Sequence, residues 1–265
     1  MSVDAFSTPA GLRVPTITTA QMREVDRVAV EEVGPNLYQM MENAGRSLAE
    51  MCAQSLGNRW TEKRIVVCAG TGGNGGGGMC AARHLANHGG DVTVVVTDAS
   101  RLTGVPADQL ALFRAAGGRV VDIVEIDSVQ ADLVVDAVLG YSLAGEPRGA
   151  AADLIAWMAR GSAPVLSLDV PSGIDSTAGF AAGIFVNAAT TMTLALPKSG
   201  LDVAAVGQLW LADIGIPREV YRRVGVHIPD GLFAAGYRVE LTPMRTGSHR
   251  ETEVVASRPD QRPAT

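Results

Sequence analysis

The sequence has few cysteines and no surplus of positive charge, and both shortages narrow the classes of protein to consider. Only three cysteines occur in 265 residues, and their spacing fits neither a zinc knuckle nor a redox pair. They are Cys52, Cys68 and Cys80, which we expect to be reduced and mostly buried thiols. The formal net charge of −6 predicts no basic surface for nucleic acid or for an anionic membrane.

Long apolar runs are also missing from the chain. No stretch is long enough to span a bilayer, and no basic segment followed by an apolar core opens the sequence. We therefore expect neither a transmembrane helix nor a signal peptide, and a cytoplasmic location. Hydrophobic residues still make up 47% of the chain and charged residues 19%, which is enough apolar material for a globular core.

Apolar periodicity predicts two helices followed by alternating strands and helices. The first two helices are expected at 19–32 and 36–55, with Thr18 or Thr19 as the first cap. Strands are expected at 64–69, 91–97, 119–124, 131–139, 163–170, 190–196 and 208–212, and further helices at 79–88, 106–116 and 150–160. This alternation predicts an α/β fold, a three-layer Rossmann-like sandwich whose doubly wound sheet is mostly parallel.

One domain is expected to hold nearly all of this order, over residues 17–245. Residues 1–16 have no clear period, so we expect an N-terminal tail. Residues 246–265 are polar and rich in Arg, Glu, Ser and Pro, so we expect a disordered C-terminal tail.

Residues 70–78 contain seven glycines in nine positions. Ordered glycine costs conformational entropy and contributes no side chain to a core. The run follows an expected strand directly and precedes an expected helix, so we interpret it as a loop whose N–H groups approach an anion. It formally holds the dinucleotide fingerprint at Gly70, Gly72 and Gly75, a weak signal that this placement strengthens. A merely flexible turn is the alternative, but such a turn does not need seven glycines.

Polar residues also gather at the ends of other expected strands, which meet at one edge of a parallel sheet. Asp136 lies within an apolar stretch, so it must bind a cation or be paired, or else accept hydrogen bonds from backbone amides. Asp169 ends another strand and is followed by Pro171 and Ser172. The oxygen atoms of Asn74, Asp136 and Ser172 would suit a hard cation rather than zinc.

Four other polar residues can be explained by structure alone. Asp98 closes the strand at 91–97, where dehydrogenases keep a ribose-binding acid, but a turn cap is the favoured interpretation. His84 and His88 lie one helical turn apart without a third metal ligand in view, so we expect solvated side chains. Lys198 either adds positive charge near the site or is a solvated turn residue.

Six segments together resemble the NAD(P)H-hydrate epimerase family, also called the YjeF N-terminal domain. The segments are 41–45 (MENAG), 70–78 with 81–85 (AARHL), 136–140 (DAVLG), 168–175 (LDVPSGID), 196–201 (LPKSGL) and 212–217 (ADIGIP). Their order and spacing carry the resemblance, which spans roughly residues 17–225. Two positions depart from the family pattern, because Gly73 replaces an Asn and Gly77 replaces an Asp, which puts substrate affinity or selectivity in question.

The resemblance implies an isomerase that interconverts the R and S epimers of NADHX and NADPHX, in which water has added to C6 of the nicotinamide ring. A separate dehydratase would then restore the S form. The family binds potassium, which implies Asn74, Asp136 and Ser172 as metal ligands. Implied substrate-binding residues are Gly73, Asn74, Gly75, Gly76, Gly77, Gly140, Tyr141, Ser142, Leu143, Ala144, Gly145, Glu146 and Asp169.

Epimerisation at C6 needs a group that gives a proton to oxygen and then takes one back, and Asp169 is the candidate catalytic residue. We expect burial at the strand end to favour its protonated form. The oligomeric state stays open, with a homodimer as one option. Two other functions remain: a non-catalytic nucleotide-binding or scaffold protein, and a nicotinamide-dependent dehydrogenase or methyltransferase. The two helices before the first strand count against the latter.

Overall fold

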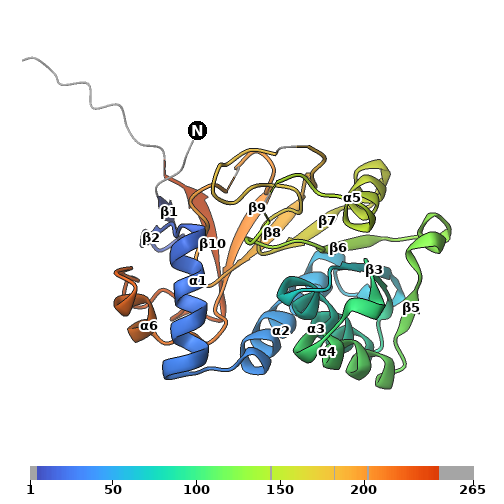
Figure 1. Ribbon diagram of the computed structural model, residues 1–265, viewed down its shortest axis with the longest axis horizontal. Coiled ribbons are helices and arrows are strands. Elements are labelled where there is room, and N and C mark those ends of the chain that lie inside the picture. The colour runs from blue at the N-terminus through green and yellow to red at the C-terminus, as the bar shows by residue number, and fades with distance from the viewer. Residues whose placement is uncertain (1–4, 144, 182, 202, 245–265) are drawn as a thin grey trace, which may run out of the picture.

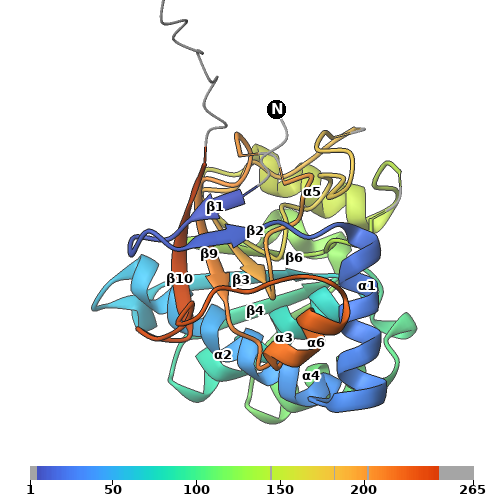
Figure 2. The same cartoon turned by 90° about the vertical axis from the view of Figure 1, so that its left-hand side faces the viewer.

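A ten-stranded sheet runs through the molecule in the order β2-β1-β10-β9-β8-β7-β6-β3-β4-β5 (Figure 1). The computed structural model describes residues 5–143, 145–181, 183–201 and 203–244. The strands are β1 Ala5–Ser7, β2 Arg13–Pro15, β3 Arg64–Ala69, β4 Asp91–Val96, β5 Arg119–Val121, β6 Leu133–Ala137, β7 Val165–Leu168, β8 Thr190–Leu194, β9 Gln208–Ala212 and β10 Arg238–Pro243. The seven strands from β9 to β5 pair in parallel, whereas β10, β1 and β2 add an antiparallel edge (Figure 2).

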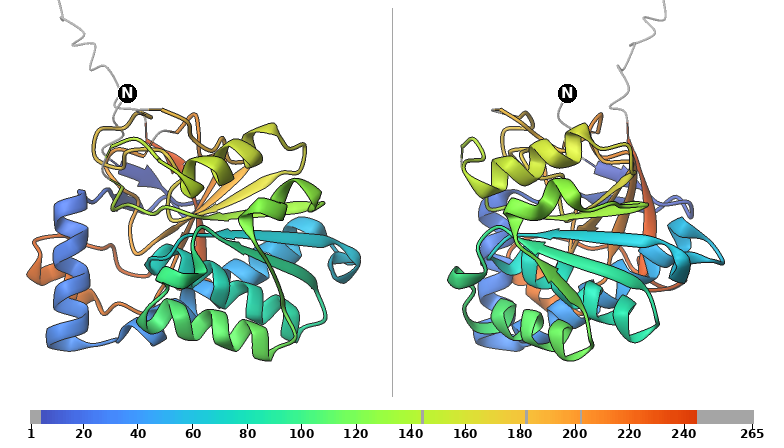
Figure 3. Two further views of the ribbon diagram at one scale, coloured as in Figure 1. Left: turned by 45° about the vertical axis from the view of Figure 1, so that its right-hand side comes forward. Right: turned by 90° about the vertical axis from the view of Figure 1, so that its right-hand side faces the viewer.

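Helices cover both faces of the parallel strands (Figure 3). They are α1 Thr19–Val28, α2 Leu37–Leu56, α3 Gly73–Asn87, α4 Gly104–Ala115, α5 Ala150–Arg160 and α6 Arg218–Arg223, with a π-helical turn at Ala29–Val33 (η1) and 3₁₀ turns at Trp60–Glu62 (η2), Ala99–Arg101 (η3) and Ile123–Ser128 (η4). On one face, Leu48, Met79 and Phe113 bring α2, α3 and α4 onto the sheet. On the other face, Leu154 and Ile155 pack α5 against it. The predicted three-layer α/β fold is confirmed.

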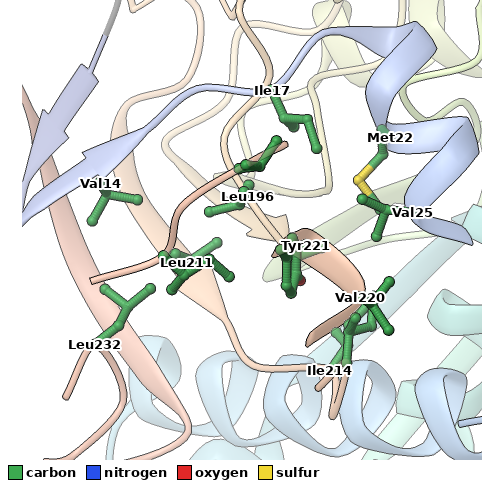
Figure 4. Packing of buried hydrophobic residues seen from close by; sticks show 14 of the residues in the cluster. Val14, Ile17, Met22, Val25, Leu196, Leu211, Ile214, Val220, Tyr221 and Leu232 are labelled. Carbon is green, nitrogen blue, oxygen red and sulfur yellow. The ribbon is translucent and has the colours of Figure 1, made fainter. Parts of the chain in front are cut away.

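A third apolar cluster fixes α1 at the antiparallel end of the sheet. Met22 and Val25 lie on one face of α1 and point toward Val220 and Tyr221 of α6 (Figure 4). Thr18 caps α1, because its hydroxyl accepts from the Gln21 N–H and the Gln21 side chain accepts from the Thr18 N–H. A helix that is capped and packed along one face holds its remaining side chains in defined places.

The strand order places a topological switch between β3 and β6. From β3 the chain moves outward through β4 and β5, whereas from β6 it moves the other way through β7, β8 and β9. The loops after β3 and β6 therefore leave the sheet in opposite directions, and a crevice opens between them. Open α/β sheets bind ligands at this position.

Several predicted boundaries are wrong in instructive ways. Residues 1–16 are not simply a tail, because Ala5–Ser7 and Arg13–Pro15 are strands of the main sheet and Phe6 is fully buried. Helix α3 begins at Gly73, six residues before the predicted start. Helix α6 and strand β10 were not predicted. The predicted tail at 246–265 lies outside the described residues. Among the described residues, no helix has the length and hydropathy needed to cross a membrane.

Candidate functional site

A cavity of about 810 Å³ opens at the carboxyl ends of β3 and β6. Its lining comes from the glycine segment after β3, from the segment after β6, and from the ends of β7 and β8. Met22 and Asp26 of α1 and Met41 of α2 close another side. The cavity thus lies at the topological switch, where the fold itself favours ligand binding.

The glycine segment, residues 70–78, packs tightly against its neighbours. A Cβ on Gly75 would lie 1.9 Å from the Gly70 carbonyl oxygen, and one on Gly78 would lie 2.5 Å from the Ala137 side chain. Gly75 and Gly78 therefore serve close packing, against the Gly70 backbone and against strand β6, which corrects the expectation that the whole run serves a ligand. Gly72 is the N-cap of α3 and lines the cavity, so the free N–H groups of the first turn lie beside it.

Asp136, in β6, is fully buried among hydrogen-bond donors. Its Oδ1 accepts from the Ser172 hydroxyl at 2.5 Å, and its Oδ2 accepts from the Ser172 N–H and the Ser167 hydroxyl, each at 2.8 Å. Burial raises the pKa of Asp136, and these hydrogen bonds oppose the rise. Among the described residues, no basic side chain forms an ion pair with this carboxylate. The Asp136 carboxylate accepts hydrogen bonds from backbone amides. This arrangement is the one that the sequence analysis gave as the alternative to a cation site.

Asn74 joins this network through the backbone of Leu139. The Asn74 Nδ2 donates to the Leu139 carbonyl at 3.0 Å, and the Ser172 Oγ lies 3.2 Å from the same oxygen. The Leu139 N–H donates in turn to the Ser172 Oγ at 2.8 Å. The structure therefore brings the three predicted metal ligands together around residues 136–139. Carboxylate, amide, hydroxyl and carbonyl oxygens are a donor set that fits a hard cation.

Asp169 follows β7 with a backbone φ of 69°, a conformation that is uncommon for a residue with a side chain. Its Oδ2 accepts from the Tyr141 N–H at 3.0 Å, and its Oδ1 pairs with the Lys198 ammonium. The side chains of Asp169 and Lys198 are only 5% and 1% exposed. Lys198 is therefore not a solvated turn residue. A left-handed conformation beside a cavity persists only where the surrounding structure enforces it, which is common at functional sites.

The predicted substrate-binding residues divide into two groups. Those that line the cavity are Gly73, Asn74, Gly77, Gly140, Tyr141, Ser142 and Asp169. Gly75 and Gly76 are buried within α3 instead, and Leu143, Gly145 and Glu146 are not part of the lining. Ala144 lies outside the described residues. The glycine at 140 has a clear purpose, because a Cβ there would meet Asp169 at 3.2 Å and Asn74 at 3.3 Å.

Three charged residues of the lining were missed by the sequence analysis: Asp26, Arg101 and Arg148. The arginines are exposed and lie in segments that follow β4 and β6, so their place after strand ends could have indicated them. Asp26 lies in the middle of α1. The signal for it is its spacing of four from buried Met22, which puts both residues on the same face of the helix.

The prediction that His84 is solvated is wrong, because its side chain is partly buried. Its Nε2 lies 2.7 Å from Glu42 Oε1, and with Cys80 they form a group whose possible ligand atoms lie within 4.8 Å of one another. The Arg83 guanidinium already donates to Glu42 at 2.5 Å and lies 3.5 Å from the Cys80 Sγ. Burial raises the pKa of Cys80 to about 12. A positive charge thus occupies this cluster, and we interpret it as an ion-paired bridge between α2 and α3.

Other expectations about single residues are confirmed. Asp98 caps η3, because its Oδ1 accepts from the Ser100 N–H at 3.0 Å, and His88 is exposed. All three cysteines are free and buried.

Comparison with known proteins places the chain among related sequences. The profile of the family described as YjeF-related protein N-terminus matches residues 37–200. The NAD(P)H-hydrate epimerase of Dehalogenimonas lykanthroporepellens is 52% identical over 237 residues, which cover 89% of this chain and 97% of that protein. The NAD(P)H-hydrate epimerase of Pirellula staleyi is 35% identical and is 93% covered.

Longer relatives match over only part of their length. The bifunctional NAD(P)H-hydrate repair enzyme Nnr of Salinibacter ruber is 35% identical over 239 residues, which cover 83% of this chain but only 44% of that protein. The crystal structure of the yeast protein ynu0 has a TM-score of 0.74 and 23% identity, with 86% of this chain and all of that chain covered, and it shows the same fold. The family match covers more than half of the sequence, and the chain belongs to the YjeF N-terminal family.

Proposed function

We propose that this protein is an NAD(P)H-hydrate epimerase, an isomerase that interconverts the R and S epimers of NADHX and NADPHX and so takes part in repair of the nicotinamide cofactor. The observation that carries the proposal is the cavity at the topological switch, where the N-terminus of α3 and the Asp169–Lys198 pair share one lining. The name of the 52% identical relative supports the substrate.

The chemistry occurs at C6 of the hydrated ring, next to the ring nitrogen N1. Donation of the N1 lone pair expels the hydroxyl as water and leaves a planar iminium ion, to which water adds again from the other face. Ring opening to an aldehyde and reclosure is the second route. Both routes need a group that moves a proton to or from oxygen, which typically contributes about 10²–10⁴-fold in rate. Asp169 is our proposed catalytic residue, because its carboxylate lines the cavity and is held from two sides.

The substrate diphosphate would bind at the N-terminus of α3. Gly72, Gly73 and Asn74 line the cavity there, and helix N-termini attract anions through free N–H groups and the helix dipole. Arg101 and Arg148 add positive charge to the same lining. Gly73 and Gly77 stand where the family has Asn and Asp, so we propose that backbone groups rather than these side chains make the contacts there.

Potassium is the proposed cofactor, and Asn74, Asp136 and Ser172 are the residues that would hold it. The donor set supports this proposal, because the buried Asp136 carboxylate, the Asn74 amide and the Ser172 hydroxyl lie together and offer oxygen atoms that suit a hard cation. When bound by these residues, potassium would supply positive charge to the site.

We further propose a cytoplasmic location, which the buried free thiols support. A separate NAD(P)H-hydrate dehydratase would act on the S epimer. The names of longer relatives, bifunctional repair enzymes that this chain covers by less than half, support such a second activity.

The test starts from a single isolated epimer of NADHX. Purified protein is added, and the R and S forms are separated by chromatography over time, with a parallel sample that lacks protein. We expect the protein to bring R and S samples to the same final ratio, well ahead of the uncatalysed reaction. Tight nucleotide binding without faster conversion would support the non-catalytic binding protein instead. Oxidation or reduction of the nicotinamide would support a dehydrogenase.

A further inference from the structure

Asp26 places a second carboxyl group in the cavity lining. It contacts the hydroxyl end of Tyr141, whereas Asp169 contacts the Tyr141 backbone. Asp26 of α1 lines the cavity and is partly exposed to it. The Tyr141 hydroxyl donates to Asp26 Oδ2 at 2.6 Å. Met22 and Val25 fix the helix face that carries it (Figure 4). Asp26 precedes the residues that the family profile matches, 37–200, and no feature of a strand end marks it.

Tyr141 therefore separates two carboxyl groups that serve one cavity. Its backbone N–H donates to Asp169 Oδ2, whereas its ring hydroxyl donates to Asp26 Oδ2. The Lys198 ammonium pairs with Asp169 and lies 5.6 Å from the centre of the Tyr141 ring. The backbone and the ring hydroxyl lie at opposite ends of this side chain, so the carboxyl groups are held apart with a defined spacing.

The environments of the two carboxyl groups differ in a useful way. Asp169 has an ammonium partner, which suits an ionised carboxylate, whereas Asp26 has the Tyr141 hydroxyl as its hydrogen-bond partner. Burial raises the pKa of Asp26, and the Tyr141 hydrogen bond and the charge of Lys198 oppose the rise while the charge of Asp169 adds to it. The charge of Asp26 also acts on Tyr221 of α6, whose pKa it helps to raise. Pairs of carboxyl groups with contrasting environments are typical of acid–base catalysis.

Epimerisation has a requirement that one carboxyl group cannot meet. The hydroxyl leaves one face of C6, and water adds to the opposite face. A carboxyl group fixed on one side of a planar iminium ring reaches oxygen on that side only. A proton-transfer group on each face would serve both steps.

We propose that Asp26 is a second catalytic residue, which exchanges protons with the C6 oxygen on the face of the ring opposite to Asp169. The proposal rests on the proposed epimerase function. In one direction, the Asp26 carboxyl protonates the C6 hydroxyl, the C–O bond breaks, and the N1 lone pair forms the N1–C6 double bond. Water then forms a new C–O bond on the other face, the double-bond pair returns to N1, and the water proton passes to Asp169.

The reaction balances without an oxidant or a reductant. One water leaves and one water adds, and one proton moves from Asp26 to Asp169. The state left behind, with Asp26 ionised and Asp169 protonated, is the state that the reverse direction needs. Exchange with solvent restores the other state.

The test compares Asp26→Asn with wild type and with Tyr141→Phe. An asparagine Oδ1 still accepts from the Tyr141 hydroxyl, so the contact between α1 and Tyr141 is preserved while the proton is lost. We expect Asp26→Asn to lower kcat by about 10²–10⁴-fold, with KM within about threefold of wild type. Glu24→Gln, on the exposed side of the same helix, is the matched control and should keep wild-type kcat.

The pH profile of kcat/KM separates catalysis from anchoring. Wild type should lose activity at high pH as Asp26 ionises, and Asp26→Asn should lack this alkaline limb. Tyr141→Phe removes the donor that stabilises the ionised carboxylate, so its alkaline limb should move to higher pH. This variant carries the test if Asp26→Asn does not fold. Activity of folded Asp26→Asn within threefold of wild type, or an unmoved limb in Tyr141→Phe, would overturn the role of Asp26 alone. An inactive wild type would overturn the proposed function with it.

Discussion

At the scale of single residues, the glycines of the segment 70–78 divide between packing and ligand access. Gly75 and Gly78 leave no room for a side chain, whereas a Cβ on Gly72 would meet nothing within 4 Å. Gly72 lines the cavity, and Gly75 does not. A glycine-rich segment of this kind can therefore lose stability at one position and ligand affinity at another.

Gly75→Ala should lower the free energy of unfolding by about 1–3 kcal/mol, because its methyl group would collide with the Gly70 carbonyl, which is backbone. The clash exceeds the gain of about 1 kcal/mol that alanine normally brings to a helix. Urea unfolding measures both this variant and the control Gly72→Ala, which should stay within about 0.5 kcal/mol of wild type. Equal stability of the two variants would contradict the packing role of Gly75.

Asp26 should make stability depend on pH. Burial raises its pKa in the folded protein, so the folded state binds this proton more tightly than the unfolded state. Asp26 therefore contributes stability below the unfolded pKa of about 4, and this contribution is lost as pH rises through the folded pKa. Asp26→Asn does not titrate, so its stability relative to wild type should increase with pH, by about 1.4 kcal/mol for each unit of raised pKa. Urea unfolding at about pH 4 and about pH 8 measures the difference in stability between the variant and wild type. The same difference at both pH values would contradict a raised pKa of Asp26.

At the scale of elements, the buried strands were the most predictable part of the fold. The predicted bounds of β3, α5 and β9 agree with the structure, because β-branched runs and amphipathic spacing are local signals. Strands β1 and β2 have three residues each, too few to show an alternating pattern, and only their distant partners define them. The early start of α3 was missed because glycine is a poor helix former and close packing overrides that preference.

The candidate site was predictable to the extent that it follows strand ends. Asn74, Asp136, Asp169 and Ser172 were found because the carboxyl ends of parallel strands meet at one edge. Asp26 was missed because it comes from a helix at the far, antiparallel end of the sheet. Only the packing of α1 brings it to Tyr141. The spacing of four from Met22 places Asp26 on the inner face of α1, but this spacing does not show that the face meets the cavity.

Asp136, at the end of β6, allows a test of the proposed potassium site by thermal melting. The melting temperature of wild type should be higher in potassium chloride than in tetramethylammonium chloride at equal ionic strength, because a bound ion stabilises the folded state. Asp136→Asn removes the charge but keeps the volume, and should melt at the same temperature in both salts. Asp136→Ala should also melt lower in both, because the Ser167 and Ser172 donors lose their buried acceptor, at about 1–3 kcal/mol each. Identical wild-type melting in the two salts would contradict the metal site.

At the scale of the whole molecule, the fold gathers groups that are far apart in the sequence. The switch between β3 and β6 opens the cavity, β7 and β8 supply Asp169 and its neighbouring backbone, and the segment that follows β8 supplies Lys198. Helix α1 adds Asp26 to the lining of the same cavity. The central claim is that carboxyl groups in this cavity exchange R and S epimers at C6.

The most direct measurement is the initial rate of epimer exchange by wild type and Asp169→Asn, each starting from one isolated epimer of NADHX. Asparagine tolerates the left-handed backbone that Asp169 adopts, so the variant should fold and should bind nucleotide. We predict rapid exchange by wild type and a loss of about 10²–10⁴-fold in Asp169→Asn. Near-normal exchange by a folded Asp169→Asn, or no exchange by wild type, would contradict the account.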